Sequence, residues 1–158
     1  MSHSALVITV SSRAAAGVYA DRSGPILVAG LAELGFEVGD PLVVPDGPPV
    51  AVALTEAVAA GHAVVLTTGG TGLNPTDQTP EMTRPLLDRE LPQLAAAVAR
   101  YGWDQGVPTA VLSRGLAGTA RGTLIVNLPG SSGGARDGMA VLAPILLHAV
   151  SQLRGGDH

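Results

Sequence analysis

The chain has 158 residues and a formal net charge of −4, with nine Lys plus Arg against 13 Asp plus Glu. Its 46% content of hydrophobic residues is enough for one substantial core, and its length is too short for two ordinary domains, so we expect residues 1–158 to form a single domain. The acidic balance excludes a broad basic surface, and we therefore expect neither nucleic acid nor an anionic membrane as a partner.

The first half of the chain alternates between predicted strands and helices. Short apolar runs predict buried strands at residues 5–10 and 63–67, and a looser alternation covers residues 36–44. Helices are predicted at residues 23–34 and 50–60, each ending at a glycine. Such alternation favours right-handed crossovers and a largely parallel sheet covered by helices.

The second half of the chain is predicted to contain shorter elements. Thr79 fits the N-cap of a helix, and Pro85 and Pro92 divide the region that follows into short helices, the last at residues 94–101. Residues 109–113 fit either a strand or a short helix.

A hairpin and a helix are predicted to complete the chain. Residues 116–120 and 123–128 flank a two-residue turn and predict a β-hairpin, and residues 136–153 have the apolar spacing of one amphipathic helix. The predicted fold class is α/β, with three layers, a mostly parallel sheet flanked by helices, and a small β-hairpin.

The amino-terminal stretch does not have the pattern of a secretion signal. It lacks a basic region, and its apolar run at residues 5–10 is too short for a signal peptide. No apolar run approaches the ~18–20 residues that span a bilayer. We expect a cytoplasmic protein.

Two absences restrict the chemistry. All nine cationic residues are Arg, and the chain has no Cys. This excludes lysine Schiff bases, the Lys of a Walker A loop, thiolate nucleophiles and Cys-bound metals. Any catalysis must rely on carboxylates, hydroxyls, Arg, backbone amides and a hard metal ion.

A glycine-rich loop follows the predicted strand at residues 63–67. Glycines at the carboxyl end of a buried strand let several backbone N–H groups approach an anion, and the neighbouring threonines add hydroxyls suited to phosphate oxygens. The alternative is a plain tight turn. The candidate ligand-binding residues of this loop are Thr68, Gly69, Gly70, Thr71 and Gly72.

Two acidic residues follow predicted strands at the same edge of the sheet. Asp46 and Asp77 could converge on one cation, and Mg²⁺ favours one or two carboxylates together with substrate phosphate oxygens and waters. Alternatively, each aspartate only forms a turn.

A second glycine-bearing connection precedes the last predicted helix. Pro129, Gly130 and Ser131 could present a hydroxyl, backbone amides and a helix N-terminus to an anion, although a plain strand-to-helix turn explains the same residues. Arg114 and Arg121 lie near this region in the sequence, and each could either bind an anion or remain a solvated charge.

Taken together, several motifs resemble the MogA/MoaB family of molybdenum cofactor biosynthesis proteins, which includes the gephyrin G domain. These motifs occur in family order over nearly the whole chain: Ser11–Arg13, Gly17–Tyr19, Pro45–Asp46, Thr67–Gly72, Asp77, Thr79–Glu81, Leu112–Arg114, Gly118 and Asn127–Gly130. The resemblance implies a homotrimeric α/β enzyme, molybdopterin adenylyltransferase. Such an enzyme uses ATP and Mg²⁺ to adenylylate molybdopterin and releases pyrophosphate.

The resemblance also implies roles for individual residues. The loop from Gly69 to Gly72 would bind the phosphate end of the pterin, Asp77 would be the acidic residue most needed for catalysis, and Asp46 would complete the site for Mg²⁺ and nucleotide. Further pocket wall is implied for Ser113, Pro129, Gly130 and Ser131.

The chain departs from the family pattern at two positions. Thr76 stands where many active members have Arg, and Ser12 stands where an Asp often occurs. These departures favour an alternative, a catalytically weak MoaB-type pterin-binding or scaffold protein of the same pathway. A generic nucleotide-binding module would explain the glycine loops but not the other motifs.

Overall fold

The computed structural model describes residues 2–157; Met1 and His158, the ends of the predicted domain, lie outside the described residues. Seven strands form one sheet in the order β2-β1-β4-β7-β6-β5, with β3 also paired to β1. Strand β1 pairs parallel with β2, β3 and β4, and β4 pairs parallel with β7, whereas β6 pairs antiparallel with β7 and β5. The strands are β1 (Ser4–Val10), β2 (Glu37–Val38), β3 (Leu42–Val44), β4 (Val64–Thr68), β5 (Arg89–Glu90), β6 (Ala117–Ala120) and β7 (Thr123–Leu128).

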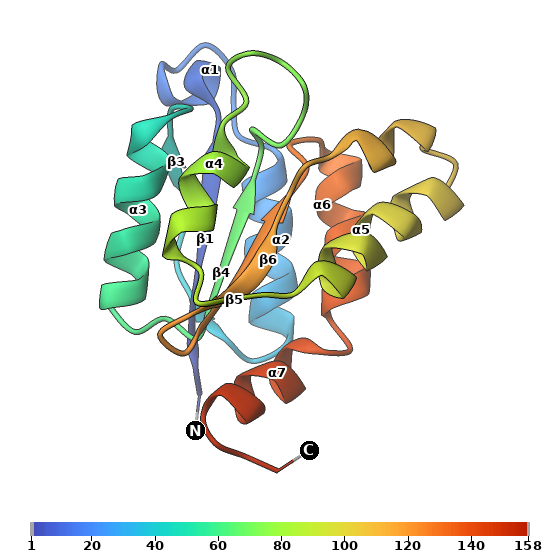
Figure 1. Ribbon diagram of the computed structural model, residues 1–158. Coiled ribbons are helices and arrows are strands. Elements are labelled where there is room, and N and C mark those ends of the chain that lie inside the picture. Colours follow the sequence, from blue (N-terminus) through green and yellow to red (C-terminus); the bar gives the residue numbers. More distant parts are fainter. Residues whose placement is uncertain (1, 158) are drawn as a thin grey trace.

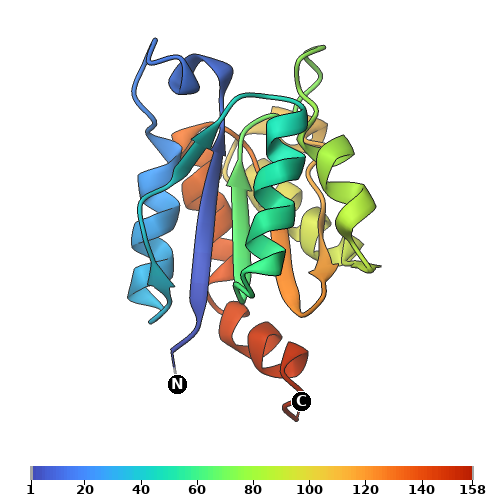
Figure 2. The same cartoon turned by 90° about the vertical axis from the view of Figure 1, so that its left-hand side faces the viewer.

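Helices cover both faces of this sheet. In Figure 1, α3 and α4 lie on one side and α2 and α6 on the other, and the view in Figure 2 brings α3 to the front. The predicted three-layer α/β class is therefore confirmed. The helices are α1 (Ser12–Ala15), α2 (Ser23–Glu33), α3 (Pro48–Ala59), α4 (Thr79–Thr83), α5 (Pro92–Asp104), α6 (Ser132–Leu142) and α7 (Leu146–Leu153), with 3₁₀ turns η1 (Arg84–Leu86) and η2 (Pro108–Leu112).

The core divides into two layers because neighbouring side chains of a strand point to opposite faces. Val7 and Leu66 pack in the layer shared with α2 and α6, whereas Ile8 and Val65 pack in the layer shared with α3. All four side chains have no exposed surface. This two-sided burial explains why the central strands are continuous apolar runs rather than alternating ones.

Several predicted elements differ from the structure. The predicted helix 136–153 is two helices, α6 and α7, because Pro144 has no N–H to donate and its ring obstructs the preceding helical turn. The alternating stretch 36–44 forms two short strands, and residues 109–113 fall mostly within the 3₁₀ turn η2. The short strand β5 was not predicted. The hairpin formed by β6 and β7 is confirmed.

The parallel strands end at one edge of the sheet, the upper end in Figure 1. The connections that leave this edge begin after Val10, Val44, Thr68 and Leu128. Open α/β sheets bind their ligands at this edge. Among residues 2–157, no helix has both the length and the apolar character needed to cross a membrane.

Candidate active site

A cavity of about 950 Å³ lies at the carboxyl edge of the sheet and is bounded by the connections that follow β1, β3, β4 and β7. A second cavity of about 590 Å³ lies beside it, on the side of α5 and η2. The predicted site residues in the first cavity are Asp46, Thr68, Gly69, Gly70, Asp77, Gly130 and Ser131. Those in the second are Gly70, Thr71, Gly72, Asp77, Ser113, Pro129, Gly130 and Ser131. The two glycine loops therefore form the wall between the cavities.

The first glycine loop follows β4, and Gly69 and Gly70 in it lie too close to neighbouring segments to carry side chains. Gly69 has φ +105°, and a Cβ atom there would lie 2.2 Å from the carbonyl oxygen of Val10. Gly70 has φ +68°, and its Cβ would lie 2.3 Å from Thr79 Oγ1. Because L side chains rarely adopt such φ values, both positions require glycine. The second loop meets the first at Gly130, whose Cβ would lie 3.1 Å from Gly69 Cα.

Threonine hydroxyls join these loops to β4 and to α4. Thr68 Oγ1 donates to the carbonyl of Pro129 at 2.8 Å, and Thr79 Oγ1 donates to the carbonyl of Gly69 at 2.9 Å. Thr67 Oγ1 accepts from Asn127 Nδ2 at 3.0 Å, below the loop. The hydroxyl hydrogen of Thr68 is thus engaged by protein. Thr79 is not an N-cap as predicted, because its side chain and its N–H both bond to the glycine loop.

Arg114 holds the other end of the glycine loop. Its guanidinium donates to the carbonyls of Gly72 and Asp77 at 2.9 and 3.0 Å and to Glu81 Oε2 at 2.6 Å, and its N–H donates to Thr71 O at 2.7 Å. Hydrogen bonding to Arg114 lowers the pKa of Glu81 below its ordinary value of 4.5. The sequence left open whether Arg114 binds an anion or remains a solvated charge. The structure agrees with neither of these alternatives. Its guanidinium braces the loop.

The ion pair of Glu81 and Arg114 predicts a pH-dependent stability. Because the pKa of Glu81 is lowered in the folded state, its contribution is present above pH 4.5 and is lost as the pH falls through the lowered pKa. With both side chains partly exposed, we expect Glu81→Gln to lose only about 0.5 kcal/mol at pH 7 and less at pH 3. Urea denaturation at both pH values measures this, with exposed Glu56→Gln as the control. An equal loss at both pH values would contradict the expectation.

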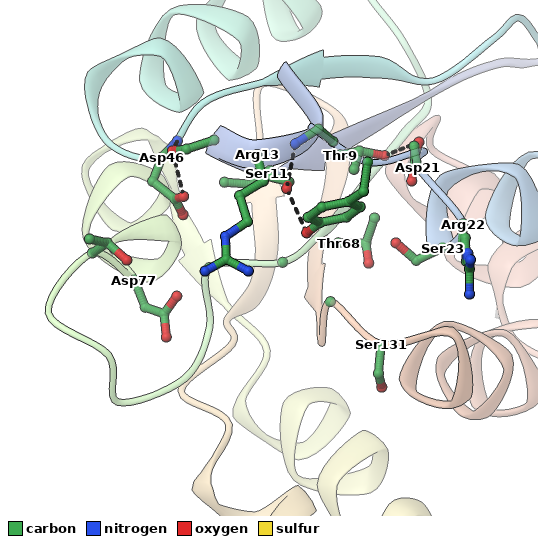
Figure 3. Close-up of a pocket in the computed structure, with 18 of the residues that line it drawn as sticks. Thr9, Ser11, Arg13, Asp21, Arg22, Ser23, Asp46, Thr68, Asp77 and Ser131 are labelled. Carbon is green, nitrogen blue, oxygen red and sulfur yellow. Dashed lines mark hydrogen bonds between the residues drawn. The ribbon is translucent and has the colours of Figure 1, made fainter. Parts of the chain in front are cut away.

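Asp46 and Asp77 lie beside two different glycines of the first glycine loop. A Cβ atom on Gly70 would lie 3.1 Å from Asp46 Oδ1, and one on Gly72 would lie 2.9 Å from Asp77 Oδ2. Figure 3 shows both carboxylates on the same side of the first cavity. Within residues 2–157, no group of three or more acidic, His or Cys side chains could hold a metal. Two carboxylates beside an open cavity suit Mg²⁺, which takes its remaining ligands from phosphates and waters.

The opposite side of the cavity contains residues that the sequence reasoning missed. Arg22 and Ser23 lie there, at the start of α2, and Arg13 extends into the cavity from α1 (Figure 3). Helices α2 and α6 both begin at this cavity, so their N-termini favour bound anions. Asp21 has a structural role, because its carboxylate accepts hydrogen bonds from Thr9 Oγ1 and from the N–H of Gly24. Ligands of open α/β sheets bind at the carboxyl ends of the strands, and the connection after β1 leaves one of these ends. This placement is the signal by which the residues of that connection could have been predicted.

Comparisons with known proteins agree over nearly the whole chain. A family model described as "Probable molybdopterin binding domain" matches residues 6–148. A molybdopterin adenylyltransferase from Pyrococcus furiosus is 37% identical over 152 residues, which are 94% of this chain and 89% of that protein. The solved structure of the molybdopterin biosynthesis Mog protein from Mycobacterium ulcerans is 51% identical, with a TM-score of 0.91 over 96% of this chain and 99% of that one.

Several similar proteins are much longer than this chain. A molybdenum cofactor biosynthesis bifunctional protein from Synechococcus elongatus is 39% identical over 155 residues, which are 98% of this chain and 48% of that protein. The chain thus spans about half the length of this bifunctional relative.

Proposed function

Because the chain belongs to the molybdopterin-binding family that includes the MogA and MoaB proteins, we propose that it transfers AMP from ATP to molybdopterin. The observation that carries this proposal is the arrangement of the first cavity. Carboxylates lie on one side of it, two helix N-termini lie on the other, and the backbone of Gly69 and Gly70 forms part of its wall. This combination suits a polyphosphate with a bound divalent ion.

The proposed reaction needs no nucleophile from the protein. A phosphate oxygen of molybdopterin attacks the α-phosphorus of ATP, a new P–O bond forms, and the bond from that phosphorus to the bridging oxygen breaks to release pyrophosphate. The attacking oxygen is already ionised at neutral pH, so no general base is required. Catalysis is then mainly positioning and electrostatic stabilisation, which agrees with the absence of Lys and Cys.

Each part of the cavity has a role in this proposal. Mg²⁺, held by Asp46 and Asp77, would supply positive charge to the triphosphate. Within the Gly69–Gly72 loop, the backbone N–H groups of Gly70, Thr71 and Gly72 would bind the phosphate end of the pterin, because the N–H of Gly69 already donates to the carbonyl of Leu128 at 3.0 Å. Residues Ser113, Pro129, Gly130 and Ser131 form the wall against which the substrates lie.

The experiment that tests this proposal is direct. Purified protein is incubated with molybdopterin, ATP and Mg²⁺, and adenylylated molybdopterin and pyrophosphate are measured by chromatography. We expect both products in equal amounts, and neither when Mg²⁺ is removed with a chelator. Tight binding of molybdopterin without product would contradict the proposal and favour the pterin-binding scaffold instead.

The homotrimer and the cytoplasmic location stay predictions. Light scattering would test the first, because a trimer has three times the 15.8 kDa mass of the chain. An interface between subunits would bury apolar side chains that are exposed in the isolated chain, such as Trp103 and Val111.

A further inference from the structure

Ser12 forms an unusual pair of hydrogen bonds with Asp46. Ser12 Oγ donates to Asp46 Oδ2 at 2.9 Å, and the same oxygen accepts from the backbone N–H of Asp46 at 3.1 Å. One hydroxyl thus bonds to both ends of a single aspartate. This closed arrangement fixes the side chain of Asp46 relative to its own backbone, although 34 positions separate the two residues.

The position of Ser12 is itself fixed by its neighbours. Ser11 N–H donates to the carbonyl of Val44 at 2.9 Å, which ties the start of α1 to the end of β3, two residues before Asp46. Ser11 Oγ accepts from the N–H of Ala14 at 3.1 Å and caps α1. The hydroxyl of Ser12 is therefore presented to Asp46 by a rigid local frame.

The two oxygens of the Asp46 carboxylate consequently differ. Oδ2 accepts from Ser12, whereas Oδ1 accepts no hydrogen bond within residues 2–157 and lies beside Gly70 at the cavity. A carboxylate with one oxygen bound and the other free is oriented before any ligand arrives. Such support of a metal ligand by an outer hydrogen bond raises metal affinity.

We propose that Ser12 is a positioning residue, which directs Asp46 Oδ1 toward a divalent cation in the first cavity. This inference rests on the proposed function only in the choice of cation. A neutral hydroxyl can donate to Asp46, whereas an ionised carboxylate at the same distance would only repel it.

Binding of Mn²⁺ alone tests this proposal without any turnover. The electron paramagnetic resonance signal of free Mn²⁺ is followed during titration of the full chain, Ser12→Ala, Ser12→Thr, Asp46→Ala and the Ser12→Ala/Asp46→Ala double variant. We expect Ser12→Ala to weaken Mn²⁺ binding about 10-fold. Ser12→Thr keeps the hydroxyl and should bind nearly as tightly as the wild type. In the Asp46→Ala background, loss of Ser12 should have almost no further effect, because it acts through Asp46.

The outcomes separate the inference from the proposed function. Equal effects of Ser12→Ala in both backgrounds, or no effect in either, would overturn the positioning role, as would a wild type that binds no Mn²⁺. Thr55→Ala, which removes an exposed hydroxyl on α3, controls for general effects, and thermal unfolding checks that each variant is folded. If Mn²⁺ binding follows the expectation but no AMP transfer occurs, the inference stands and the proposed function is wrong.

Discussion

Asp77→Asn is expected to reduce the rate of AMP transfer by about 10²–10³-fold while the protein stays folded. Asp77 lines both cavities and is one of the two carboxylates beside the glycine loop. Its removal would take away half of the negative charge proposed to hold Mg²⁺. The amide keeps an oxygen that can accept from the N–H of Asn74, as Oδ2 does now at 3.1 Å. The loop should therefore keep its shape, and the loss should be in the rate.

Two further variants make this prediction specific. Asp77→Ala removes both the charge and the bond to Asn74, so we expect it to be as inactive as Asp77→Asn and slightly less stable. Asp40→Asn removes an exposed carboxylate that lines neither cavity, and it should transfer AMP at the wild-type rate. Chromatographic rates and urea denaturation measure both properties. Full activity of Asp77→Asn would show that the Asp77 carboxylate is not needed for catalysis, even if the wild type is an adenylyltransferase.

Much of the fold could be predicted because the central strands are buried on both faces. Runs such as Ala63–Thr67 are continuous and apolar, and they alternate with helices that end at glycines, which leaves few alternatives to a parallel sheet. The prediction of one helix over residues 136–153 was wrong, because a single proline interrupts a helix whose apolar pattern continues. The apolar spacing of residues 136–153 continues through Pro144, but the backbone cannot continue as one helix there.

The candidate site could be predicted only in part, for a physical reason. Glycine loops and aspartates after strands are visible in a sequence, because parallel strands bring their ends to one edge. Hydrogen-bond partners between distant segments are not visible. Nothing in the pattern near Arg114 shows that it binds Glu81 and two loop carbonyls, or that Ser12 bonds to Asp46. Which of these side chains become partners depends on how closely the connections between strands and helices approach one another in the folded chain.

Gly69→Ala is expected to destabilise the protein by about 2–5 kcal/mol. This loss of stability has two causes, backbone strain and a steric clash. An alanine at φ +105° is strained by about 1–2 kcal/mol, whatever space surrounds it. The remainder comes from the Cβ atom, which would lie 2.2 Å from the carbonyl oxygen of Val10 in the central strand β1. Either the loop or β1 must move, and both carry residues of the cavity.

Gly35→Ala provides the matched control for backbone strain. Gly35 has φ +94°, close to that of Gly69, but a Cβ atom there meets nothing within 4 Å. We expect this variant to lose only the strain component of about 1–2 kcal/mol and to keep the wild-type rate of AMP transfer. Free energies of unfolding in urea for the two variants measure the difference, which is the cost of contact with Val10. Equal losses would show that the glycine loop can move away from β1. If Gly69→Ala also kept full activity, the close approach of the loop to β1 would not be needed for function.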